Sequence, residues 1–140
     1  MTMRRFLSFF TDRRGVSALE FALIAPILSS VLILGWDGWM MISQTTDMRT
    51  AVQTGARYYQ IGGSDDAAAK TAALAAWVHK PADGALTVAR VCYCGTAAND
   101  CSSTCASGTP STYLTLTATS TFSGAIEHKA LTQSEVIRVR

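Results

Sequence analysis

The sequence is poor in charged side chains and in the patterns that carry catalysis. Only 16% of its 140 residues are Asp, Glu, Lys or Arg. From Val16 onward, eight basic side chains stand against nine acidic ones, so the basic excess that nucleic-acid binding needs is missing. No serine lies in a G-x-S-x-G or S-x-x-K pattern. His79 is expected at a helix C-terminus and His128 in a loop. We therefore expect no enzyme, cofactor, nucleic-acid partner or small-molecule substrate.

Cysteine is absent before Cys92, which excludes a lipoprotein signal. A small-x-small cleavage site is also absent after the apolar run that starts at Val16, so a removed secretory signal is disfavoured. Residues 16–36 would rise about 31 Å as a helix, close to the hydrocarbon core of about 30 Å. Trp36 and Trp39 would lie in the interfacial aromatic belt, and Asp37 would mark the return to water. We predict a retained transmembrane helix over residues 16–36.

The flank that precedes this helix is basic. Residues 1–15 contain four arginines and one acidic residue. By the positive-inside rule this leader stays in the cytoplasm, and the rest of the chain is exported. The expected location is the inner membrane, with a single pass and a periplasmic C-terminal domain. Pro26 lies within the span and should kink or loosen the helix there.

The segment 37–61 is predicted to continue this helix beyond the membrane. The helical pattern itself ends at about Gln60. A second helix is predicted from Asp65 to about His79, with Ser64 as its N-cap. Pro81 would stop this helix. Its apolar face is predicted to hold Leu74, Trp77 and Val78.

Residues 85–94, 113–122 and 135–140 alternate between apolar and polar side chains, which is typical of strands. The predicted domain, residues 62–140, is therefore α+β, with one helix and a three-stranded, mainly antiparallel sheet. The first strand would have one face made of Leu86, Val88, Arg90 and Cys92. The other two would point Leu114, Leu116, Ala118, Phe122, Ile137 and Val139 inward.

All four cysteines lie in the exported domain, in the spacing C-x-C-x6-C-x3-C. An even, clustered set in an oxidising compartment predicts disulfides. The spacing matches no usual zinc knuckle, so no metal site is expected. Nested pairing, Cys92 with Cys105 and Cys94 with Cys101, suits a loop closed on a hairpin, but the spacing alone leaves the connectivity open.

Glu20 is the most informative residue. A carboxylate inside a membrane segment costs a few kcal/mol and needs a partner. Cleavage after Gly15 would give Val16 a free, positive α-amino group and make Glu20 the fifth residue of the mature chain. The two groups would then be available to pair, within one subunit or between subunits.

The run Arg13-Arg14-Gly15, followed by Glu20-Phe21 and an apolar stretch that ends at Pro26, resembles the N-terminus of TadE-like minor pilins. These pseudopilins belong to the tight-adherence, or Flp, pilus system. The resemblance is close over residues 13–36 and looser to about residue 60. It implies a prepilin peptidase that cuts after Gly15, and other pilin subunits as partners. Phe21 stands where the major pilins of that system usually carry tyrosine.

The predicted protein is a pilin-like lollipop with a structural role in pilus assembly, incorporated in an extracellular pilus. A minor pseudopilin of type II secretion has the same arrangement of a glycine before the cleavage site and a glutamate at the fifth mature position, and it remains an alternative. So does an uncleaved, membrane-anchored periplasmic binding module. An enzyme on a membrane stalk would need a catalytic constellation that the sequence does not offer.

Overall fold

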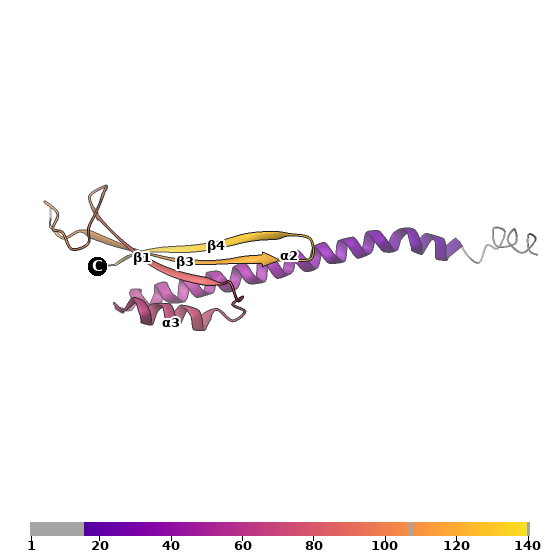
Figure 1. Cartoon of the computed structure of the whole chain (residues 1–140), viewed down its shortest axis with the longest axis horizontal. Coiled ribbons are helices and arrows are strands. Elements are labelled where there is room, and N and C mark those ends of the chain that lie inside the picture. The colour runs from indigo at the N-terminus through magenta and orange to yellow at the C-terminus, as the bar shows by residue number, and fades with distance from the viewer. Residues whose placement is uncertain (1–15, 107, 140) are drawn as a thin grey trace, which may run out of the picture.

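The molecule is a long helix with a small α+β domain packed on its second half (Figure 1). The computed structural model describes residues 16–106 and 108–139. The predicted α+β class, with a long N-terminal helix and an antiparallel sheet, is confirmed. The elements are α2 (Val16–Gln60), α3 (Asp66–Ala76), β1 (Ala85–Cys94), β2 (Ala97–Asn99), β3 (Ser111–Ser123) and β4 (His128–Val139).

Helix α2 has 45 residues and would be about 68 Å long at 1.5 Å per residue. It runs through Pro26 without a break. It ends at Gln60, as the sequence pattern predicts. Gly62 follows with a φ of 97°, and its N–H donates to the carbonyl of Tyr59. A glycine in the left-handed region is a frequent helix stop because it has no Cβ to clash there.

Helix α3 is shorter than predicted, and its cap differs. The N-cap is Asp65 rather than Ser64, and its carboxylate accepts the N–H of Ala67 at 2.8 Å. The helix ends at Ala76, before His79. Val78 therefore leaves the helical face and is exposed, while Trp77 is buried as expected.

The sheet has four strands in the order β2-β1-β3-β4, and every neighbouring pair is antiparallel. The prediction of three strands was wrong because β2 spans only three residues and has no alternating pattern. The prediction of a short terminal strand at residues 135–140 was also wrong. Strand β4 begins at His128 and pairs with β3 along its whole length. It lies at the edge of the sheet, and its first half carries mostly polar or exposed side chains, so the apolar alternation is weak there.

The core lies between one face of the sheet and the outer half of α2, with α3 closing one side. Among the strands, β3 contributes most, because its inward side chains are almost completely buried. The helices contribute several alanines, which let their backbones approach closely. The buried core is formed by Met48, Ala51, Val52, Ala56, Tyr59, Ala69, Ala73, Trp77, Leu86, Leu114, Leu116, Ala118 and Ile137.

Gly55 lies where α2 approaches α3 and β3 closely. A Cβ there would lie 3.2 Å from the Cβ of Ala73 and would overlap the side chain of Leu116. We expect Gly55→Ala to lower the free energy of unfolding by about 1–3 kcal/mol, the usual cost of overpacking. The measurement is urea unfolding of the full chain in mild detergent, followed by near-ultraviolet circular dichroism.

The matched control is Gly38→Ala on the same helix, where a Cβ would meet nothing within 4 Å. Alanine is favoured over glycine in helices by about 1 kcal/mol, so this variant should be neutral or more stable. If both variants were equally stable, close packing at Gly55 would be refuted.

Candidate functional site

Residues 17–36 of α2 form a bare segment that takes no part in the buried core. Along residues 17–36 every side chain is exposed except that of Ala25, which is half-buried. Of the described residues, this helix alone is long and apolar enough to cross a membrane. The hydroxyls of Ser29 and Ser30 donate to backbone carbonyls one turn earlier, each at 2.8 Å. These polar groups are thus satisfied within the helix, as a bilayer requires. The segment fits a single-pass membrane anchor.

The predicted assembly residues lie at the start of this bare segment. Val16 is the first residue of α2, and Glu20 follows four residues later. Glu20 and Phe21 are both exposed, and no ion pair among the described residues includes Glu20. Gly15 lies outside the described residues, and cleavage after it stays a prediction. The pairing of Glu20 with an α-amino group remains a prediction.

Asp37 was expected to mark the return to water, but its carboxylate is covered by the protein itself and not by solvent. Its side chain is only 7% exposed, because the turn between β3 and β4 packs over it. The two carboxylate oxygens accept the N–H groups of Ala125 at 3.0 Å and Ile126 at 2.8 Å. These hydrogen bonds lower the pKa of Asp37 below its ordinary value. No local sequence signal could have found this contact, since the partners lie 88 and 89 residues away.

Further side chains fasten the outer half of α2 to the domain. The Gln44 amide donates to the Ser120 hydroxyl at 2.8 Å, and that hydroxyl donates to the Met48 sulfur at 3.2 Å. His79 is not at a helix C-terminus as predicted. Its Nδ1 lies 2.9 Å from the Asp47 carboxylate of α2. These contacts hold the domain at a fixed place along the helix.

His128 was predicted in a loop, but it is the first residue of β4. Its Nδ1 lies 3.0 Å from the Ser123 hydroxyl, opposite it across the β3–β4 ladder. The hairpin therefore stays paired to its last residues before the turn. His128 is thus paired with a serine hydroxyl and His79 with a carboxylate, and no hydrogen bond among the described residues joins the two pairs.

The distal end of α2 is joined to α3 and β1 through Asp66. The Tyr59 hydroxyl donates to Asp66 Oδ1 at 2.7 Å, and Arg90 Nη2 donates to the same oxygen at 2.9 Å. The hydrogen bond from Tyr59, and then the one from Arg90, lower the pKa of Asp66. Burial, together with the bond to this carboxylate, raises the pKa of Tyr59. The cluster links three elements and is structural.

The four cysteines form two disulfides at the end of the molecule opposite the bare helix (Figure 1). Cys92 pairs with Cys101 and Cys94 with Cys105, with Cα separations of 5.0 and 5.5 Å. The nested pairing that suited a hairpin is wrong, because the β1–β2 turn is tight and sets Cys94 opposite Ala97. Cys101 follows two residues after the end of β2, where Asn99 pairs with Cys92, and so lies close to Cys92.

This crossed pairing can be tested by removing cysteines two at a time. Cys92→Ser with Cys101→Ser should leave one bridge and no free thiol in non-reduced protein. Cys92→Ser with Cys105→Ser should break both bridges and leave two free thiols. The chain-entropy model gives each bridge about 2–4 kcal/mol, so the second variant should also be less stable. Thiol titration of the denatured protein measures the number of free thiols. Two free thiols in the first variant and none in the second would support nested pairing.

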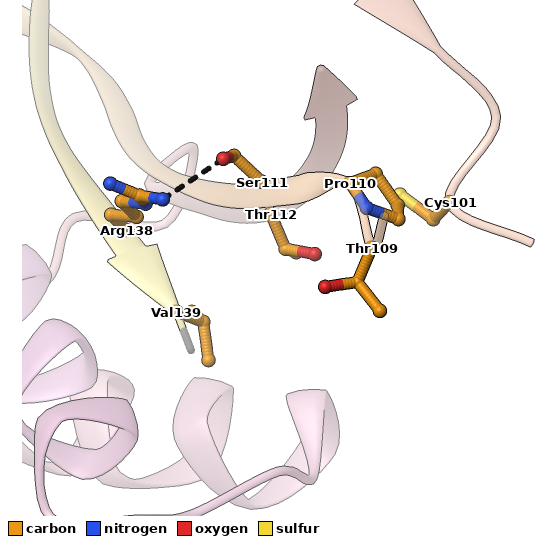
Figure 2. Close-up of a pocket in the computed structure, with 7 residues that line it drawn as sticks. All are labelled: Cys101, Thr109, Pro110, Ser111, Thr112, Arg138 and Val139. Carbon is orange, nitrogen blue, oxygen red and sulfur yellow. Dashed lines mark hydrogen bonds between the residues drawn. The ribbon is translucent and has the colours of Figure 1, made fainter. Parts of the chain in front are cut away.

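The described residues of the domain form open surface clefts. One cleft of about 550 Å³ lies between the disulfide loop and the end of β4 (Figure 2). Arg138 Nη2 donates to the Ser111 hydroxyl across it at 3.0 Å. Within the described ranges, no three His, Cys, Asp or Glu side chains are grouped so that they could hold a metal ion. The cleft is lined by Cys101, Thr109, Pro110, Ser111, Thr112, Arg138 and Val139.

Comparison with known proteins finds a family match for the long helix and none for the domain packed on it. A family model described as TadE-like protein matches residues 15–57. The chain carries a TadE-like segment. The resemblance inferred from the sequence is thereby confirmed, and it supports a protein of the tight-adherence pilus system, whose TadE-like members are structural. No curated protein and no solved structure matches the chain. The TadE-like segment begins at Gly15 and covers all but the last turn of α2, so the sheet and the disulfide loop lie outside it.

Proposed function

We propose that this protein is a minor pilin, or pseudopilin, that builds a tight-adherence pilus. A prepilin peptidase cuts it after Gly15 on the cytoplasmic side. Residues 16–36 then cross the inner membrane, and residues 62–140 form the periplasmic domain. The observation that carries the proposal is the TadE-like match, which starts at Gly15 and lies on a helix whose first half is bare.

The bare half of α2 exposes too much apolar surface for a protein in water. Soluble monomers rarely expose contiguous apolar patches of more than a few hundred Å². Lipid before assembly, and neighbouring subunits after it, are the two environments that would cover this surface. The exposed large apolar side chains of the segment are Leu19, Phe21, Leu23, Ile24, Ile27, Leu28, Val31, Leu32, Ile33, Leu34 and Trp36.

Glu20 supplies the specific contact in this assembly. Cleavage gives Val16 a positive α-amino group, and the Glu20 carboxylate pairs with that group on a neighbouring subunit. A pair within one subunit would only offset the cost of placing the charge in the membrane. A pair between subunits would also set their axial register, so we favour it.

Glu20→Gln tests the assembly role because it keeps the shape of the side chain and removes its charge. We expect cleavage and membrane insertion to persist. Recovery of other pilins with the variant should fall about tenfold, equivalent to about 1.4 kcal/mol of lost contact energy. Quantitative mass spectrometry of affinity-purified complexes measures that recovery.

Glu135→Gln, the same change on β4, is the matched control and should behave like the unchanged protein. Normal partner recovery and piliation with Glu20→Gln would refute the assembly role. Loss of cleavage would instead make Glu20 part of the peptidase recognition sequence. A type II secretion pseudopilin would assemble by the same logic, and the TadE-like match favours the tight-adherence system. An uncleaved binding module would keep the mass of residues 1–15.

A further inference from the structure

The turn between β3 and β4, residues 124–127, lies at the membrane end of the domain. Asp37, which holds this turn, comes directly after Trp36, the last residue of the proposed span. One residue of helix adds about 1.5 Å, so the turn is level with the end of the span. Figure 1 shows this turn against the middle of α2, where the bare segment ends, with the disulfide loop at the far end of the domain.

The turn is held firmly in that place. Besides the two N–H groups bound by Asp37, the N–H of Gly124 donates to the Glu127 carbonyl at 2.9 Å. A Cβ at Gly124 would lie 2.6 Å from Asp37 Oδ2, so only glycine permits this close approach. The backbone of the turn thus faces the helix, and its side chains are free to face outward.

The turn presents an apolar side chain at this level. Ile126 is 59% exposed, although the backbone on either side of it is fixed. Trp36 and Trp39, on the adjoining turns of α2, are 65% and 68% exposed. Exposed tryptophans at the end of an apolar helix are typical of the membrane–water interface. Ile126 therefore exposes an apolar side chain at about the level of these tryptophans, on an element remote in sequence.

We propose that residues 124–127 form a second contact with the lipid bilayer, in which Ile126 enters the interfacial layer beside α2. This inference rests on the proposed membrane anchoring of α2. A lone helix lets the domain tilt and rotate above the membrane, whereas a second contact, fixed to the helix by Asp37, sets the orientation of the domain. A subunit that leaves the bilayer for a pilus must give this contact up.

Photo-crosslinking to lipid tests the proposal on the full chain in phospholipid nanodiscs. A benzophenone amino acid is placed at Ile126, at Leu28 in the bare helix, or at Ala98 in β2 near the disulfides. Mass spectrometry after irradiation counts lipid adducts. We expect adducts at Ile126 and Leu28, and at least several-fold fewer at Ala98.

The outcomes separate this inference from the proposed anchor. Adducts at Leu28 but not at Ile126 would overturn the second contact and leave the anchor standing. Adducts at neither position would overturn both. Protein adducts at Ile126 in place of lipid would assign the turn to a subunit interface and refute the lipid contact. A probe at Glu127, exposed on the same turn, should repeat the Ile126 result if the first variant folds poorly.

Discussion

A Gly15→Val variant is expected to keep residues 1–15 almost completely in cells that carry the prepilin peptidase. The peptidase must fit the residue before the scissile bond into a small space, and valine adds a branched side chain there. The uncleaved chain would have no α-amino group at Val16, so the partner proposed for Glu20 would also be lost. The intact mass of membrane-extracted protein distinguishes the two forms directly.

The control for this experiment is Gly35→Val, the same substitution further along the chain. A Cβ at Gly35 would meet nothing within 4 Å, so the helix tolerates a side chain there. This variant should be cleaved like the unchanged protein. If Gly15→Val also gave the mature mass, cleavage after Gly15 would be refuted. If both variants stayed uncleaved, cleavage would depend on the sequence of the helix and not specifically on the residue before the scissile bond.

Leu116→Ala should have the largest effect on the stability of the domain. Leu116 is completely buried at the centre of β3, between Val88 of β1 and Glu135 of β4, and its side chain lies against Gly55 of α2. Truncating a buried leucine costs about 2–5 kcal/mol, depending on how far the cavity can collapse. A typical domain has only about 5–15 kcal/mol in total, so much of the stability would go. Urea unfolding in mild detergent measures the change.

The neighbouring position gives a matched control. Thr117 follows Leu116 on β3 and points to the opposite face of the sheet, so Thr117→Ala removes atoms from the outer face and leaves the core intact. We expect a change within about 0.5 kcal/mol. Equal losses for the two variants would mean that α2 and the sheet do not form one core around Leu116. Cleavage after Gly15 should persist in both variants, because the core is remote from the site.

Much of the fold could be predicted because its signals are local. The apolar run and the amphipathic pattern after it fixed the course of α2, and the glycines after Gln60 explain its end. The alternation in β3 identified which of its side chains face the core, among them Leu114 and Leu116, whereas the alternation in β1 only separated its two faces. The motif around Gly15 and Glu20 pointed to the TadE-like family from less than a fifth of the chain. In each case the signal is a pattern of residues that are close together in the sequence.

Tertiary structure decided what depends on segments far apart in the chain. Four cysteines allow three pairings, and the register of the short β2 strand selected the crossed one. The partner of His79 and the extent of β4 likewise depend on which elements pack together. Asp37 shows the reason most clearly. In sequence it is an acid after an apolar run, which reads as the end of a membrane segment. Only the folded chain brings two backbone N–H groups from a distant turn to its carboxylate. Asp37 is therefore buried and holds the β3–β4 turn against α2.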